Sequence, residues 1–488
     1  MRIVRLVCVF ALALCLASAV YAETQSIKIS GDLAIRSINR GDYDLDKNHA
    51  EAAATRADNS DDWQNYFMST TEVQIDADLT DNVAGVIRLY NQRDWDVRTK
   101  TETATSNPST DYVANADEFD VGVNLAYIEL KEFLYSPLTL RIGCQNLWFG
   151  KGFIVGAHFI NPTASINATE YSCQKSFDAI RATLDYDPWT IDVIASKIWE
   201  NAIGSNDDVD LYGVNVGYIF DVYNAEAEGY YFLKADRGLE SWNIDDLNSV
   251  HTMGIRGSMD PIENWTVAAE SALQLGKYVG SKSATQGRER CAWAIDASLE
   301  CRYFTDKFAW KPIVAAEYIY YSGDKKTSTE DVNSEGVYNG WDIMYRGKFD
   351  SAIREFQGLF YTTNQDVNNQ RTNMLPRYPD AADSNQHQVV VAGSIQPTDS
   401  LMVEARYINF WQQYATYHYD PAHTGTGVDE RIKDKKYLGS EIDVQAAWDY
   451  TEDVQFGLLC AWYFPGAHYY DQSDDVATDI VGTVKLSF

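Results

Sequence analysis

The sequence has 488 residues, of which 45% are hydrophobic and 23% are charged, and its formal net charge is −31 at pH 7. Such an acidic chain repels nucleic acid, so a nucleic-acid-binding function is excluded. The aromatic content is high, with 32 Tyr, 19 Phe and 13 Trp residues.

Residues 1–22 have the features of a secretory signal peptide. Arg2 and Arg5 precede an apolar stretch, and Val20-Tyr21-Ala22 places small residues where a signal peptidase reads. The stretch is shorter than the about 20 residues of a membrane-spanning helix. We therefore predict cleavage after Ala22. No later segment is apolar enough for such a helix, so the exported part, residues 23–488, is either soluble or a β-barrel.

The remaining sequence alternates apolar and polar residues in runs of about ten, which is the pattern of outer-membrane barrel strands. In the last run, Ile480, Val484 and Phe488 are on one face, and Thr483 and Lys485 are on the other. An aromatic residue at the end of such a strand resembles the signal that the barrel-assembly machinery reads, which makes that machinery an expected partner.

Short turns and long connections alternate between these runs. Asp, Asn, Pro and Ser mark the short turns, as is typical of tight hairpins. The turns are at Thr80-Asp81-Asn82, Leu134 to Pro137, Asp185 to Pro188, Asp221 to Asn224, Asp260 to Asn264, Thr305-Asp306-Lys307, Pro397 to Ser400 and Thr451-Glu452-Asp453. The long connections are at about 41–63, 101–118, 150–174, 203–208, 236–247, 279–288, 324–385, 414–436 and 465–475.

This pattern predicts an all-β fold: a transmembrane, antiparallel, up-and-down β-barrel of about 18 strands, integral to the outer membrane and surrounded by its lipid. The short turns and both termini are expected in the periplasm. The stretch at about 324–385 is expected to be a long extracellular loop, which in a barrel can fold into the mouth as a lid or constriction. A barrel of this width can enclose an aqueous channel.

One stretch resembles a known family. Arg141-Ile142-Gly143-Cys144-Gln145-Asn146-Leu147, followed by Phe149-Gly150 and by Lys175-Ser176-Phe177-Asp178-Ala179-Ile180-Arg181, is similar to the alginate export family of outer-membrane porins. Members have a G-R-Q-E-L-type strand followed by an R-x-F-D-G-V-R-type strand. Cys144 and Lys175 replace arginines that are common in the family. The resemblance implies an eighteen-stranded porin with a basic lumen that guides carboxylated sugars.

The alternation also predicts which side chains face the lumen, because Arg or Lys facing lipid at mid-membrane costs about 2–4 kcal/mol. The inward basic side chains include Arg36 and Lys311. We predict that the substrate path is lined by Arg88, Arg141, Gln145, Lys175, Arg181, Arg256, Arg302, Arg406 and Glu404.

Carboxylates are at least as numerous on these inward faces: Glu72, Asp76, Asp78, Glu226, Glu228, Glu270, Asp296, Glu300, Glu317, Glu404, Glu441 and Asp443. Two interpretations stay open. Opposed acidic and basic walls produce a transverse field that favours small polar solutes over apolar ones. Alternatively, the charges pair across strands and hold the wall rigid.

Other chemistry has little support in the sequence. Asp42, Asp44 and Asp46 resemble the start of a calcium loop, but Lys47 and Ala53 occupy the positions of its Gly and its bidentate Glu, so we expect no metal site or cofactor. No G-x-S-x-G motif is present, and we expect no enzyme. Cys291 and Cys301 lie on one predicted strand, too far apart to bond to each other.

The leading hypothesis is therefore a porin for passive passage of hydrophilic solutes, including acidic oligosaccharides as in alginate export. The alternative is a structural or surface-interaction barrel whose acidic loops bind a partner and whose pore is closed. A soluble, β-rich periplasmic binding protein is a third reading.

Overall fold

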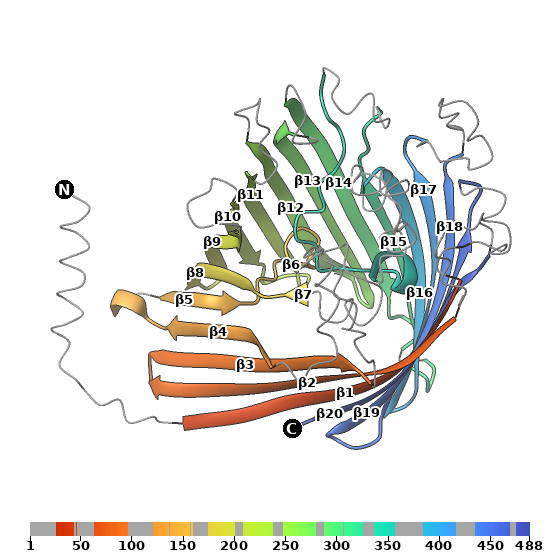
Figure 1. Cartoon of the computed structure of the whole chain (residues 1–488), viewed down its shortest axis with the longest axis horizontal. Coiled ribbons are helices and arrows are strands. Elements are labelled where there is room, and N and C mark those ends of the chain that lie inside the picture. The colour runs from red at the N-terminus through yellow and green to blue at the C-terminus, as the bar shows by residue number, and fades with distance from the viewer. Residues whose placement is uncertain are drawn as a thin grey trace, which may run out of the picture.

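The computed structural model describes residues 26–42, 45, 63–95, 121–135, 137–156, 158–159, 174–200, 208–237, 247–279, 287–305, 307–325, 336–356, 384–415, 435–468 and 475–488. Eighteen strands form one sheet (Figure 1). They are β1 (Ser26–Gly41), β2 (Trp63–Thr80), β3 (Val83–Asp94), β4 (Gly122–Leu130), β5 (Leu138–Gln145), β8 (Phe177–Tyr186), β9 (Trp189–Trp199), β10 (Val209–Ile219), β11 (Glu226–Asp236), β12 (Asn248–Ile262), β13 (Trp265–Tyr278), β14 (Arg288–Cys301), β15 (Ile313–Tyr321), β16 (Gln386–Thr398), β17 (Leu401–Gln412), β18 (Tyr437–Asp449), β19 (Val454–Pro465) and β20 (Ala477–Ser487).

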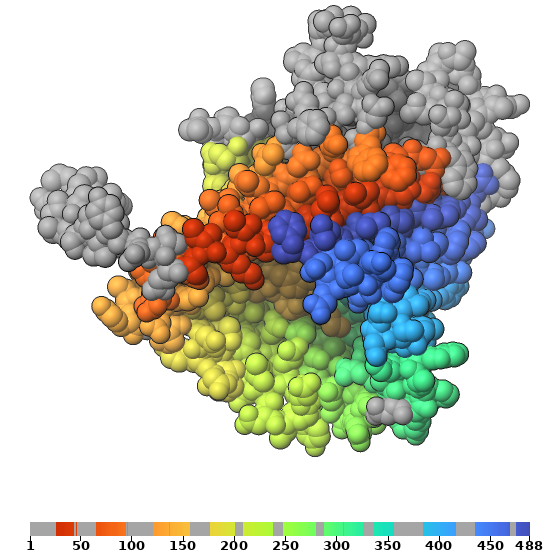
Figure 2. Space-filling model, turned by 90° about the horizontal axis from the view of Figure 1, so that it is seen from below, coloured from red at the N-terminus to blue at the C-terminus, as the bar shows by residue number. Residues whose placement is uncertain are grey.

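The sheet closes on itself, because the first and last strands pair. Each strand is antiparallel to the next, and β1 pairs with both β2 and β20. The register at this seam places Asp32 opposite Ser487 and Gly41 opposite Thr478. Figure 2 shows the seam as the red N-terminal strand lying beside the dark blue C-terminal strand. The predicted all-β, eighteen-stranded, up-and-down barrel is confirmed.

The predicted turns fall between consecutive strands, and most residues of the predicted long connections lie outside the described residues. The turn between β14 and β15 is longer than expected. Lys311 therefore lies outside β15, and its ammonium pairs with the exposed Asp399. The prediction that Lys311 is on an inward strand face is wrong, because the alternation rule was extended past the end of the strand.

Regular structure other than barrel strands is sparse in the described residues. It consists of the short strands β6 (His158–Phe159) and β7 (Gln174–Lys175), the 3-10 turn η2 (Phe133–Tyr135) and the π-helical turn η3 (Ala352–Phe356). None of the helices within the described ranges is long and apolar enough to cross a membrane. Residues 1–25, with the predicted signal peptide, lie outside the described residues.

Candidate functional site: the barrel lumen

The two faces of the wall differ as the alternation predicts. Ile255 on β12 is 70% exposed, and its neighbours on the same face of adjacent strands, such as Leu273 and Trp293, are also exposed. Arg256, the next residue on β12, turns the other way and contacts carboxylates of β11. A barrel in lipid places its apolar side chains outside, so the face with Arg256 lines the lumen.

Two stretches between strands return into this lumen. We call residues 146–156 the first inner segment and residues 336–356 the second inner segment. They bond to each other, with Tyr345 N donating to Ile154 O at 3.0 Å and Gly156 N donating to Tyr345 O at 2.7 Å. In Figure 1 the second inner segment, drawn in teal, runs across the interior of the barrel and ends in a short helical turn near β16. The described part of the predicted long loop therefore occupies the lumen.

The inner segments cover one wall of the barrel with apolar contacts. Phe153 stacks on Tyr321 at a centroid distance of 5.6 Å, and Phe177 meets Tyr345 edge-on at 5.7 Å. Every strand from β8 to β15 contributes a buried residue to this cluster, which comprises Leu147, Phe149, Phe153, Ile154, Val155, Phe177, Ala179, Ile194, Leu211, Phe232, Val250, Ala272, Ala292, Ala294, Ile319, Tyr321, Trp341, Met344 and Tyr345. Close packing excludes water from the part of this wall that the inner segments cover.

Lys348 fixes the second inner segment to β14 and β15. Its ammonium lies 2.7 Å from Asp296 Oδ2, 2.5 Å from Glu317 Oε1 and 3.4 Å from Asp350 Oδ2. Burial favours the neutral amine, but the surrounding carboxylates of Asp350, Asp296 and Glu317 outweigh it and hold the pKa of Lys348 well above its ordinary value. Lys348 therefore stays charged at neutral pH and ties the segment to the wall.

Each end of the second inner segment has a further anchor. Near its start, Asp342 pairs with Lys234 of β11 at 3.1 Å. Burial acts against the Asp342 carboxylate, but Lys234 and Arg290 hold its pKa below the ordinary value. At the other end, the buried Glu441 of β18 accepts hydrogen bonds from Ile353 N at 2.7 Å and Arg354 N at 3.1 Å. These contacts span the lumen from β11 to β18.

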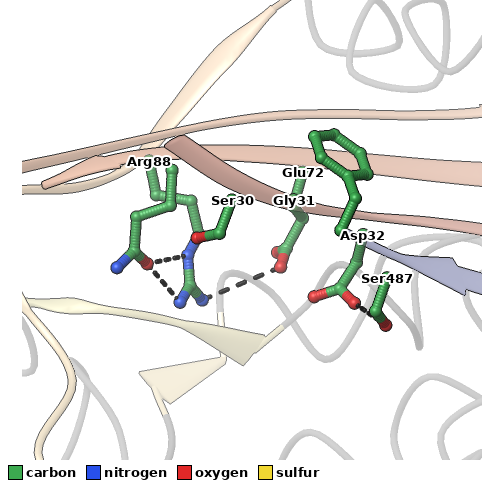
Figure 3. Close-up of a pocket in the computed structure, with 8 residues that line it drawn as sticks. Ser30, Gly31, Asp32, Glu72, Arg88 and Ser487 are labelled. Atoms are coloured by element: carbon green, nitrogen blue, oxygen red, sulfur yellow. Dashed lines mark hydrogen bonds and ion pairs between the residues drawn. The ribbon is translucent and has the colours of Figure 1, made fainter. Parts of the chain in front are cut away.

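Part of the wall formed by β1–β5 and β20 is polar, although Ile38, Met68 and Val481 form a small buried apolar cluster there. Arg88 on β3 donates from Nε and Nη2 to Gln74 Oε1 at 2.9 and 2.6 Å, and its Nη1 lies 3.7 Å from Glu72 Oε2. Asp32 of β1 accepts from Ser487 Oγ at 2.6 Å. Figure 3 shows these side chains on one side of the strands, around a pocket.

The predicted lining arginines have a common feature, the charge pairing that was one of the two interpretations of the sequence. Every described arginine among them is in an ion pair with a carboxylate: Arg88 with Glu72, Arg141 with Glu129, Arg181 with Asp192, Arg256 with Glu226 and Glu228, Arg302 with Glu300, and Arg406 with Glu404. Phe149 lies under Arg181, so the first inner segment covers that guanidinium.

Two further predicted residues are Gln145 and Lys175. Gln145 is fully buried, and its amide donates to Ala179 O at 2.9 Å, so it fastens β5 to β8. The side chain of Lys175 lies outside the described residues. Sequence reasoning did not single out Lys348 or Asp342, because the loop that carries them has no hydrophobic period from which an inward face could be read.

No group of three His, Cys, Asp or Glu side chains in the described ranges is arranged to hold a metal ion. Of the calcium candidates, Asp42 is described, and its carbonyl accepts from Leu45 N at 3.1 Å. Asp44 and Asp46 lie outside the described residues. Cys144 Sγ donates to Asn124 O at 3.3 Å, and Cys291, Cys301 and Cys460 are free thiols.

Comparison with known families matches residues 45–483 to the alginate export model. The chain belongs to the alginate export family. Among solved structures, this family member is similar to Pseudomonas aeruginosa OpdL, with 9% identity, a TM-score of 0.51, and coverage of 94% of this chain and 99% of that chain. Pseudomonas aeruginosa OpdQ gives 9% identity, a TM-score of 0.50, and coverage of 95% and 98%. No curated protein matches the sequence.

The family and the closed barrel make the chain an outer-membrane channel of the porin type for hydrophilic solutes. This family and fold are those of channels, not of enzymes.

Proposed function

We propose that solutes cross this barrel passively, past the polar side chains of β1–β5 and β20 and past the charged pairs that other strands present to the lumen. The observation that carries the proposal is the asymmetry of the lumen. The wall of β8–β15 is packed against apolar side chains of the inner segments, whereas that of β1–β3 and β20 presents Ser30, Asp32, Gln74 and Arg88 to a pocket. Hydrophilic solutes need such hydrogen-bonding groups along their path.

The decisive experiment is reconstitution of the purified protein in a planar bilayer in KCl. We expect stepwise ion conductance. A barrel that inserts but never conducts would contradict the proposal and favour the alternative, a structural or surface-interaction barrel with a closed pore.

The packing of the second inner segment is the observation that favours this alternative, because its anchors reach from β11 to β18. A variant in which residues 336–356 are replaced by a short Gly-Ser linker separates the two functions. If the variant conducts and the intact protein does not, the segment closes the pore. Conductance of both, larger in the variant, supports a constricted channel.

The chemical class of the transported solute is a separate question from the channel function. The name of the alginate export family suggests an acidic sugar polymer, and arginine suits carboxylates because its guanidinium binds both oxygens. We keep Arg88, Arg141, Arg181, Arg256, Arg302, Arg406, Glu404, Gln145 and Lys175 as proposed substrate-path residues. The paired arginines count against a dedicated polyanion conduit, since each one already has a carboxylate partner.

Reversal potentials in a KCl gradient test the polyanion route. A polyanion conduit should prefer anions, and Arg141→Ala and Arg181→Ala should each reduce that preference. Cation preference that persists in both variants rules the conduit out and leaves a general porin.

The proposals for export and assembly rest on sequence features. We propose cleavage after Ala22, membrane lipid as the surrounding solvent, and recognition of Phe488 by the barrel-assembly machinery. N-terminal sequencing of the purified protein tests the first. Loss of outer-membrane assembly on Phe488→Ala tests the last.

We propose no cofactor. Calcium titration followed by equilibrium dialysis tests the Asp42, Asp44 and Asp46 loop.

A further inference from the structure

The pocket on the polar wall has the size of a small solute. It encloses about 210 Å³ and is lined by Ser30, Gly31, Asp32, Glu72, Gln74, Arg88, Ser487 and Phe488. Pockets that bind drug-sized ligands measure roughly 300–1,000 Å³, so this smaller pocket suits one sugar ring rather than a polymer segment. Figure 3 shows that its polar side chains come from neighbouring strands and converge on one space.

The charges at the pocket are compensated within the wall. Lys485 lies 3.2 Å from Asp32 Oδ1, and Arg88 faces Glu72 across 3.7 Å. Glu72 Oε1 also accepts from Asn124 Nδ2 at 3.3 Å. Two cations thus face two carboxylates. An anionic solute would have to displace a carboxylate from its partner, and a cationic one would have to displace Arg88 or Lys485.

The hydrogen-bonding groups suit hydroxyls, which both donate and accept. Serine hydroxyls and carboxylate oxygens accept, while serine hydroxyls and the guanidinium donate. The 3.7 Å separation between Arg88 Nη1 and Glu72 Oε2 exceeds hydrogen-bond length, so Nη1 can donate to a ligand oxygen. Ser30, on the same inward face of β1, supplies a further hydroxyl at the rim of the pocket.

We infer that this pocket is a subsite for an uncharged polyhydroxylated solute, of the size of one sugar ring, in the conduction path. The inference rests on the proposed channel function and narrows its cargo. It differs from the polyanion cargo that the family name suggests, because the wall offers an anion no uncompensated cation among the described pocket residues.

The test compares three solutes with the same ring and different charge: glucose, glucuronate and glucosamine. Their uptake is measured in proteoliposomes that contain the full-length protein, at neutral pH and matched ionic strength. KCl conductance of the same preparation is recorded in parallel. We expect glucose to enter several-fold faster than either charged analogue, and its uptake to saturate with concentration.

Two matched variants locate the subsite. Ser30→Trp fills the pocket from the inward face of β1, and Ser258→Trp places the same side chain on the inward face of β12. We expect Ser30→Trp to remove the saturable glucose uptake and Ser258→Trp to retain it. Folding of both variants is checked by the change in electrophoretic mobility that heating produces in a folded barrel.

The outcomes separate this inference from the channel proposal. Absence of KCl conductance overturns the proposed function itself. With conductance present, faster uptake of glucuronate or glucosamine than of glucose overturns the assignment to an uncharged solute. Equal saturable uptake in wild type and Ser30→Trp overturns the assignment to this pocket.

Discussion

Gly31 and Phe488 bond to each other through both of their backbone groups, with Gly31 N donating to Phe488 O and Phe488 N donating to Gly31 O, each at 3.0 Å. The pair extends the seam between β1 and β20. A Cβ atom added to Gly31 would lie 2.7 Å from Phe488 Cζ and 2.6 Å from Glu72 O. The aromatic ring thus occupies the space that a side chain at residue 31 would need, so any other residue there forces the ring or the neighbouring backbone to shift.

Gly31→Ala should therefore weaken barrel closure. Overpacking of this kind costs about 1–3 kcal/mol, and we expect a loss of that size in the free energy of unfolding in urea. Gly482→Ala is the control, because a Cβ atom there has no neighbour within 4 Å. Equal stability of the two variants would show that the Phe488 ring yields without cost.

Lys348→Met should loosen the second inner segment. The substitution leaves Asp296, Glu317 and Asp350 without their shared cation, and breaking a buried ion pair costs about 3–5 kcal/mol. We expect faster hydrogen exchange in residues 336–356 and a larger single-channel conductance.

Lys311→Met is the matched control for this substitution, because Lys311 pairs with the fully exposed Asp399 and exposed pairs contribute about 0–1 kcal/mol. If hydrogen exchange in residues 336–356 is as slow in Lys348→Met as in Lys311→Met, Lys348 does not hold the segment.

The anchor at Asp342 predicts a response to acid. Its pKa in the folded protein is lowered by Lys234 and Arg290 against the effect of burial. A depressed carboxyl pKa adds stability above the unfolded value, about 3.9, and this stability is lost as pH falls through the folded pKa. Below about pH 4 we expect the segment to loosen and conductance to rise. Asp342→Asn should make the rise smaller. An unchanged acid response in that variant would assign it to other carboxylates.

The orientation of β12 predicts that an added charge destabilises the protein on one face of the strand and has little effect on the other. Ile255→Arg places a guanidinium in lipid near mid-membrane and should cost about 2–4 kcal/mol. Ser258→Arg, on the lumen face opposite Glu226, should cost little. The free energy of unfolding in urea, measured for each variant in lipid vesicles, gives both costs. A similar loss in the two variants would contradict the assignment of faces.

The sequence alone determined the barrel, because lipid and water impose a two-residue period on every strand and tight turns require particular residues. The alternation placed Arg256 and Ile255 on opposite faces, and the motif from Arg141 to Arg181 identified the family. These features are local along the chain and therefore readable in it.

The tertiary structure alone decided what fills the lumen and which charges are paired. Lys348 is about fifty residues from Asp296 in the sequence, and Glu441 is 87 residues from Arg354. No local pattern encodes contacts over such separations, since an irregular loop has no period to read. Gly31 and Phe488 are likewise far apart in the sequence and meet only when the barrel closes. The pocket beside them therefore exists only in the closed sheet.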